Sequence, residues 1–264
     1  KAKTIKTSNE EGILINKNEI DFESLKSKDK EDLLKLYGDK EELIFDYSQL
    51  ERKISIPKRN KSIVDEFRNV ILYGDQNYKS EIKPREGKTI VFAVTQKHAI
   101  KLAQLFDDAF AEKKDLPTTR YADFVVSSGN DTETSRKKIR DFKKKEFPKI
   151  LVSVGMLDTG FDCEEVLNLV FARHVKSNVL YQQMRGRGTR LCKPIQKDRF
   201  WIFDFSGVTD FHKDKEDTEN QGSLVILKDS KKSKSTNNLI ELPVDDWIDP
   251  NSRKEINYDE NGNI

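Results

Sequence analysis

The sequence predicts an α/β fold: a doubly wound parallel sheet with helices on both faces, flanked by charged segments at both ends. Between residues 89 and 205, short apolar runs alternate with helical patterns. These runs are almost continuously apolar, which is typical of parallel strands that are buried on both faces. Hydrophobic residues are only 35% of the 264 residues and charged residues are 36%, so we expect the core to be concentrated in this central part.

Two helices are expected before the central region. The first, from Asp29 to Phe45, takes its apolar side from leucines around Leu33. The second, from Lys61 to about Tyr73, carries apolar residues at helical spacing. Each pattern predicts an amphipathic helix that packs one face against a core.

Five strands and two intervening helices are expected in the central region. The predicted strands are residues 89–94, 124–126, 150–154, 167–171 and 200–205. Leu102 and Phe106 mark a helix after the first strand. The helix after the second strand has an acidic start at Glu133 and a basic end at residues 143–145, which suits the helix dipole, and Pro148 ends it.

The chain is expected to have three parts. Residues 1–84 are an N-terminal extension, residues 85–206 form the α/β domain, and residues 207–264 are a polar linker or the start of a following region. The run from His212 to Gln221 is interpreted as a solvated charge run. Later apolar anchors occur only at residues 224–227 and 239–247. Because residue 1 is Lys rather than Met, we expect a fragment or a processed chain.

Composition excludes several classes of protein. The 48 basic and 46 acidic residues leave a net charge of only +2, which argues against disorder driven by one sign of charge and against nucleic-acid binding by bulk charge alone. No apolar run approaches the roughly 20 residues of a membrane span, and no signal peptide opens the chain. Two cysteines are too few for a disulfide scaffold or a zinc site of four cysteines, so we expect reduced thiols, no metal site and a cytoplasmic protein.

Two short segments each resemble one part of a nucleotide-hydrolysing site. Residues 87–89, Gly-Lys-Thr, resemble the end of a P-loop, but Ile82 stands at the place of its first glycine and a strand follows instead of a helix. The pair Asp65-Glu66 resembles an acidic pair that holds Mg²⁺, but it lies within a helical pattern. We reject both, so this sequence offers no complete set of groups for ATP hydrolysis.

The first informative segment is residues 181–190. It places Arg185, Arg187 and Arg190 within six residues, together with two glycines. The planar, permanently charged guanidinium matches phosphate oxygens, and glycine lets the backbone approach a partner closely. Surface ion pairs would explain the arginines equally well. Spacing alone leaves these two alternatives open.

The second informative segment is residues 150–162. A buried strand runs into a glycine-containing turn that ends in Gly160-Phe161-Asp162. Loops at the carboxyl ends of strands are where open α/β sheets bind ligands. In isolation, however, Asp162 is better explained as a carboxylate that caps a turn or helix.

Taken in order, three segments resemble the second RecA-like domain of superfamily two helicases and translocases. Residues 89–99 resemble motif IV, residues 150–162 resemble motif V, and residues 183–190 fit motif VI, Q-x-x-G-R-x-x-R. The patterns T-x-x-H-A, M-L-x-T-G-F-D and G-R-G-T-R-L are similar to the R (restriction, motor) subunit of type I restriction enzymes. The segment from Tyr47 to Asn60 resembles the part of that family before motif IV.

The resemblance has departures. Met184 stands where motif VI often has Arg, and Val154-Gly155 stand where many helicases have Thr-Asp in motif V. The second departure weakens the expectation that motif V contacts DNA as it does in helicases. His98, in the motif IV segment, is interpreted as a structural residue that caps or packs.

The resemblance implies roles for the matched positions. Arg187 and Arg190 would be catalytic arginine fingers that reach the γ-phosphate of ATP on another domain. The residues implied at the ATP cleft are Gln183, Gly160, Asp162 and Gly186. Those implied to bind the nucleic-acid backbone are Thr95, Ser127, Ser128, Gly129 and Ser153.

The resemblance also implies the larger machine. It is an ATP-dependent DNA translocase within a type I site-specific deoxyribonuclease, in the cytoplasm of a bacterium or archaeon. ATP and Mg²⁺ would be bound mainly by the first RecA-like domain of the same chain. Double-stranded DNA and the modification and specificity subunits would be partners, and this fragment alone would be inactive. The alternatives are the second lobe of another DNA or RNA helicase, or an inert α/β module that binds nucleic acid or a partner.

Overall fold

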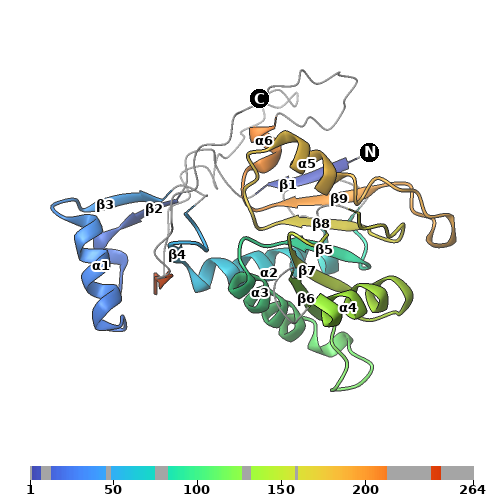
Figure 1. Ribbon diagram of the computed structural model, residues 1–264, viewed down its shortest axis with the longest axis horizontal. Coiled ribbons are helices and arrows are strands. Elements are labelled where there is room, and N and C mark those ends of the chain that lie inside the picture. Colours follow the sequence, from blue (N-terminus) through green and yellow to red (C-terminus); the bar gives the residue numbers. More distant parts are fainter. Residues whose placement is uncertain are drawn as a thin grey trace.

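The computed structural model describes residues 2–6, 13–45, 49–74, 83–126, 132–157, 160–212 and 239–244. These residues form a central α/β domain with a smaller module beside it (Figure 1). The strands are β1 (Ala2–Lys6), β2 (Ile13–Asn16), β3 (Glu42–Phe45), β4 (Ile54–Ser55), β5 (Thr89–Phe92), β6 (Ala122–Val126), β7 (Ile150–Val154), β8 (Asn168–Phe171), β9 (Phe200–Asp204) and β10 (Ile240–Glu241). The α-helices are α1 (Ser27–Tyr37), α2 (Pro57–Tyr73), α3 (Gln96–Ala109), α4 (Thr132–Lys144), α5 (Asn178–Arg185) and α6 (Val208–Phe211).

The central sheet is parallel throughout. Its six strands lie in the order β1-β9-β8-β5-β7-β6, and every neighbouring pair is parallel. The five strands expected from the sequence are all present, within two residues of the predicted bounds. The sixth, β1, pairs with β9 at the edge of the sheet and was not expected in the charged N-terminal segment.

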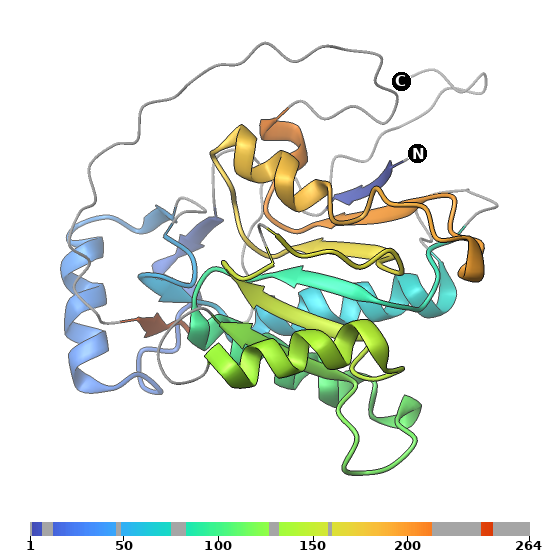
Figure 2. The same cartoon turned by 45° about the vertical axis from the view of Figure 1, so that its right-hand side comes forward.

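Helices cover both faces of the sheet, as a doubly wound fold requires. On one face, α2 and α3 pack on side chains such as Val91 and Val152. On the other face, α4, α5 and α6 pack on Ile90, Phe92 and Leu151. Because successive residues of a strand point to opposite faces, the continuous apolar runs fill both cores. The predicted fold class is confirmed (Figure 2).

The first predicted helix is wrong in its second half. α1 ends at Tyr37 because Gly38 follows with a φ of +52°, a conformation that favours glycine and stops the helix. Residues 42–45, expected to be helical, instead form β3, which pairs antiparallel with β2. The second helix, α2, begins at Pro57, four residues earlier than expected, because proline suits the first helical position.

A small module is built from two distant parts of the chain. Its core joins side chains of β2, α1 and residues 50–56 to Ile240, Leu242 and Val244. β10 pairs parallel with β4, and Ile240 lies opposite Ile54. Thus part of the predicted C-terminal anchor, residues 239–247, packs on the N-terminal extension. The other anchor, residues 224–227, lies outside the described residues.

Two further features bear on the class of protein. Cys163 and Cys192 are buried free thiols. Among the helices of the described ranges, none is long and apolar enough to cross a bilayer. The two reduced cysteines expected from the sequence are therefore present, and each is packed in the protein interior.

Candidate functional site

The candidate site brings together the loop after β7 and the loop after α5. The first loop holds residues 160–163 and the second holds residues 186–190, which are more than twenty residues away in the sequence. The Arg187 guanidinium donates a hydrogen bond to the carbonyl oxygen of Phe161. In the same two loops, Arg190 Nη1 lies 2.9 Å from Asp162 Oδ2 in an ion pair. The two segments singled out in the sequence therefore meet in space.

The Arg190–Asp162 pair is open to solvent. Its side chains are 55% and 49% exposed. Such half-exposed ion pairs contribute roughly 0–1 kcal/mol to stability, because water competes for both charges. The pair can therefore separate at little cost. Both groups remain accessible to a ligand from outside the domain.

Glycines shape both loops. Gly160 has a φ of +67°, in the left-handed region that glycine adopts readily. Gly188 packs directly on a core aromatic ring, and a Cβ there would lie 2.3 Å from Phe200 Cδ2. Gly186 caps the end of α5, and its carbonyl accepts a hydrogen bond of 3.0 Å from Thr189 Oγ1. These glycines set the path of the arginine-bearing loop.

Helix α5 carries two positions of the segment that fits motif VI, one exposed and one buried. Its N-terminus is capped by Ser177, whose hydroxyl accepts from the N–H of Leu180. Tyr181 and Met184 are buried in the core, whereas Gln183 is exposed. The departure at Met184 thus has a packing explanation, because this position faces the sheet.

A segment that the sequence assigned to solvent also supports α5. His212 was placed in a solvated charge run, but its ring stacks on Tyr181 with centroids 4.6 Å apart and an interplanar angle of 10°. Its Nε2 lies 2.7 Å from the carbonyl oxygen of Val175. The expectation for His212 is therefore wrong. The sequence offered no clear signal of this contact, since its neighbours from residue 213 onward are highly charged.

The turn after β5, which resembles motif IV in sequence, is closed by His98. Its Nδ1 accepts from the N–H of Val94 at 3.2 Å, and its own backbone N–H donates to Thr95 Oγ1 at 3.2 Å. Burial, with a smaller contribution from the nearby Arg59, lowers the pKa of His98 to about 3, so the ring is neutral. His98 is structural, as predicted. Thr95 is only half-buried at the carboxyl end of β5.

The other predicted nucleic-acid residues are placed differently. Ser153 is 1% exposed, and its hydroxyl accepts from the N–H of Leu157 at 3.1 Å. Its side chain therefore shapes the turn after β7 and is not presented to a ligand, which corrects the expectation of a phosphate contact. Ser127, Ser128 and Gly129 lie outside the described residues.

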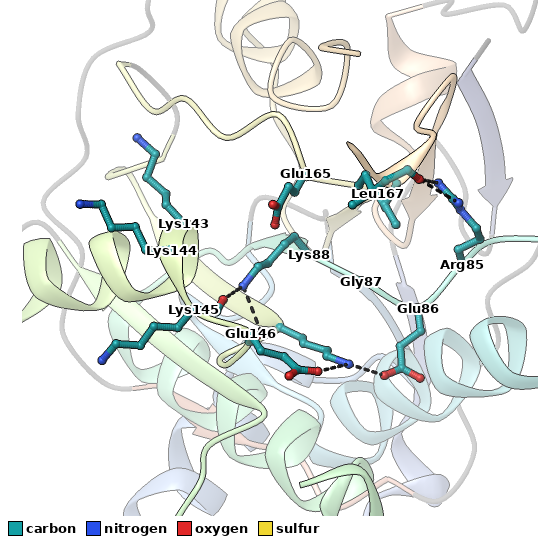
Figure 3. Close-up of a pocket in the computed structure, with 12 residues that line it drawn as sticks. Arg85, Glu86, Gly87, Lys88, Lys143, Lys144, Lys145, Glu146, Glu165 and Leu167 are labelled. Carbon is teal, nitrogen blue, oxygen red and sulfur yellow. Dashed lines mark hydrogen bonds and ion pairs between the residues drawn. The ribbon is translucent and has the colours of Figure 1, made fainter. Parts of the chain in front are cut away.

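A cavity of about 420 Å³ lies at the amino edge of the sheet (Figure 3). Its lining includes Gly87 and Lys88, from the segment that resembles the end of a P-loop. The Lys88 ammonium donates to the carbonyl oxygens of Lys145 and Glu146, the latter at 3.1 Å, and so holds the turn that follows α4. Burial lowers the pKa of this amine. Asp65-Glu66 lies within α2, so both rejections agree with the structure.

A known protein family matches the part of the chain that holds these loops. Residues 74–192 match the helicase conserved C-terminal domain. The matched range contains both of the paired loops described above. No group of three or more metal-binding side chains gathers within the described ranges.

Two curated proteins similar to the chain are subunits of type I restriction enzymes. Over 163 residues the chain is 35% identical to the type I restriction enzyme EcoKI endonuclease subunit of Escherichia coli (strain K12), covering 61% of this chain and 13% of that protein. It is 25% identical over 154 residues to the EcoAI endonuclease subunit of Escherichia coli, covering 58% and 18%. A fragment structure of a putative HsdR subunit from Vibrio vulnificus YJ016 is 26% identical, with a TM-score of 0.45, covering 61% and 32%.

The two Escherichia coli subunits confirm the predicted resemblance. The chain is similar to the R subunit of type I restriction enzymes, and the similarity extends beyond the bare helicase motifs. The chain spans less than a fifth of the length of either curated relative. The activity of a whole R subunit is therefore a proposal for this chain.

Proposed function

We propose that this chain is the second motor lobe of an ATP-dependent DNA translocase, the R subunit of a type I restriction endonuclease. The observation that carries this proposal is the contact of Arg187 and Arg190 with the loop of Phe161 and Asp162. Two neighbouring arginines of one surface loop are the groups that would meet a nucleotide held by the first RecA-like domain. In this role the lone lobe hydrolyses no ATP and cleaves no DNA.

Arg187 and Arg190 would act as paired donors to the γ-phosphate. A guanidinium offers a planar set of N–H donors that fits phosphate oxygens, and its charge is permanent. When no nucleotide is bound, Asp162 orients Arg190. Because this ion pair is half-exposed, a phosphate group can replace Asp162 as the partner of Arg190 at little cost. Bound ATP and Mg²⁺ would supply the phosphoryl group whose hydrolysis drives the motor. The arginines would stabilise the negative charge of the transferring group.

The remaining cleft residues would position this pair. Gly160 and Gly186 set the course of the two loops, and the exposed Gln183 would link the nucleotide to the domain interface. Thr95, with Ser127, Ser128 and Gly129, would contact the DNA backbone without reading its sequence. Double-stranded DNA and the modification and specificity subunits are the proposed partners. The first RecA-like domain of the same chain would complete the cleft.

A two-lobe protein tests the class of machine. We expect no DNA-stimulated ATP turnover from the 264-residue chain, and turnover from a protein in which the first RecA-like domain precedes it. Turnover by the isolated chain would contradict the division of roles. If the two-lobe protein also gave no turnover, the chain would be an inert α/β module. If its ATPase responded to RNA and not to duplex DNA, the protein would be an RNA helicase.

A further inference from the structure

The outer face of α4 carries a row of cations at helical spacing. Lys137, Arg140 and Lys144 are all exposed, and they are separated by three and four residues, which places them on one side of a helix. The opposite side of α4 is buried through Ser135 and Phe142. We call Lys137, Arg140 and Lys144 the α4 basic row. Figures 1 and 2 both show α4 on the outside of the sheet.

The charges of this row are not used inside the domain. Within the part of the chain that the structure describes, no carboxylate forms an ion pair with any of the three. Their neighbours differ: Lys138 lies 2.7 Å from Asp123, and Lys145 lies 3.1 Å from Asp141. The helix dipole explains a basic residue in the last turn, such as Lys144, but not Lys137 or Arg140 earlier in the helix.

The row leads from the carboxyl edge of the sheet to the cavity at its amino edge. α4 begins after the carboxyl end of β6, the same edge as Thr95, and ends beside the cavity that Lys143 and Lys144 line. Figure 3 shows Lys143 and Lys144 pointing away from the carboxylates Glu146 and Glu165. The Lys144 ammonium is therefore presented to solvent, whereas the Lys143 ammonium lies over the Phe161 ring, 5.5 Å from its centroid.

The spacing of the row fits a phosphate backbone. At about 1.5 Å per residue, Lys137 and Lys144 are about 10 Å apart along the helix axis. One strand of duplex DNA carries a charge about every 3.4 Å of its axis, so this length corresponds to about three or four phosphates. Since the three cations have no carboxylate partner among the described residues, their charge is available to a phosphate backbone although the net charge of the chain is only +2.

We propose that the α4 basic row is a second contact with the backbone of double-stranded DNA, outside the helicase motifs. This proposal rests on the proposed function, because the row continues the DNA-facing edge of the domain along α4. The contact is electrostatic and independent of sequence, and it would hold the duplex on this lobe while the motif IV turn changes its grip.

The salt dependence of DNA binding tests the proposal. The 264-residue chain is titrated against a fluorescent duplex of about 30 base pairs at several salt concentrations. The variant Lys137→Gln/Arg140→Gln/Lys144→Gln should bind roughly tenfold or more weakly at about 50 mM salt. The slope of log K against log salt should fall by about 0.9 for each phosphate that is no longer neutralised, so by up to about 2.7. Its thermal unfolding should be unchanged, because the three side chains are exposed.

A matched control removes the same charge elsewhere. The variant Lys28→Gln/Lys35→Gln/Lys40→Gln alters three exposed cations of the small module, and it should leave the slope unchanged. Equal slopes for the two triple variants, or no duplex binding by the parent chain at the lowest salt concentration, would overturn the proposal. A row variant that kept DNA binding and lost binding to poly-glutamate would assign the surface to an acidic protein instead. The proposed function is judged separately, by ATP turnover of the two-lobe protein.

Discussion

The replacement Gly188→Ala tests whether packing requires a glycine at the second glycine position of the loop after α5, residues 186–190. An alanine Cβ would lie 2.3 Å from Cδ2 and 2.7 Å from Cγ of Phe200, well inside contact distance. Phe200 is the first residue of β9 and is 6% exposed, so its ring cannot swing into solvent without opening the core. We therefore expect a displaced loop or ring and a loss of about 1–3 kcal/mol of unfolding free energy.

The assay is thermal and urea unfolding of the parent chain and the variant. A loss of about 2 kcal/mol corresponds to a decrease in Tm of roughly 4–8 °C for a chain of this size. The replacement Phe200→Leu provides the matched background, because a smaller side chain leaves room for the new methyl group. In that background Gly188→Ala should cost less than half as much. An unchanged Tm for Gly188→Ala alone, or an equal cost in both backgrounds, would refute the packing argument.

Three other contacts allow tests of the same kind. Asp162→Asn should change the unfolding free energy by less than about 1 kcal/mol, since its ion pair with Arg190 is half-exposed, and a loss above about 2 kcal/mol would contradict this. The folded-state pKa of His98 is about 3, below its unfolded value near 6.5, so its contribution to stability is lost as the pH falls from 6.5 towards 3. Measured by urea unfolding, the free energy of unfolding of the parent should fall by about 2 kcal/mol more than that of His98→Asn between about pH 7 and pH 5. Parallel pH profiles of the two proteins would count against a buried neutral ring. Lys88→Met should destabilise the chain by about 1–3 kcal/mol, because the turn after α4 loses a donor to the carbonyl groups of Lys145 and Glu146. ATP turnover of the two-lobe protein should stay normal, and lost turnover with normal stability would revive the P-loop interpretation.

The central domain was predictable because its signals are local and repeated. Each buried strand is a continuous apolar run such as residues 150–154, and each is followed by a turn or helix signal. The two segments around Asp162 and Arg190 could be singled out because glycine and arginine in such a pattern are an unusual way to build a core. Their contact with each other could not be derived from spacing alone. It depends on the order of the strands and on the length of α5.

The remaining errors share a physical cause, since they depend on contacts between distant parts of the chain. Residues 42–45 carry helix-compatible residues, yet they form a strand because β2 offers a partner. Ser153 was expected to bind the nucleic-acid backbone at a strand end, but its hydroxyl accepts from the N–H of Leu157 in the turn after β7. β1 and β10 are short strands in charged segments, and only their partners β9 and β4 make them strands. Local propensity is a weak guide in such segments.

The most direct test of the motor-lobe assignment is the ATPase of the two-lobe protein carrying Arg187→Ala or Arg190→Ala. Loss of an arginine finger lowers turnover by about 10³–10⁵-fold. We expect DNA-stimulated turnover to fall at least roughly a hundredfold in each variant, with ATP binding unchanged within a few fold, while Lys35→Ala on α1 behaves as the parent. Near-normal turnover in both arginine variants would contradict the account, whatever their stability.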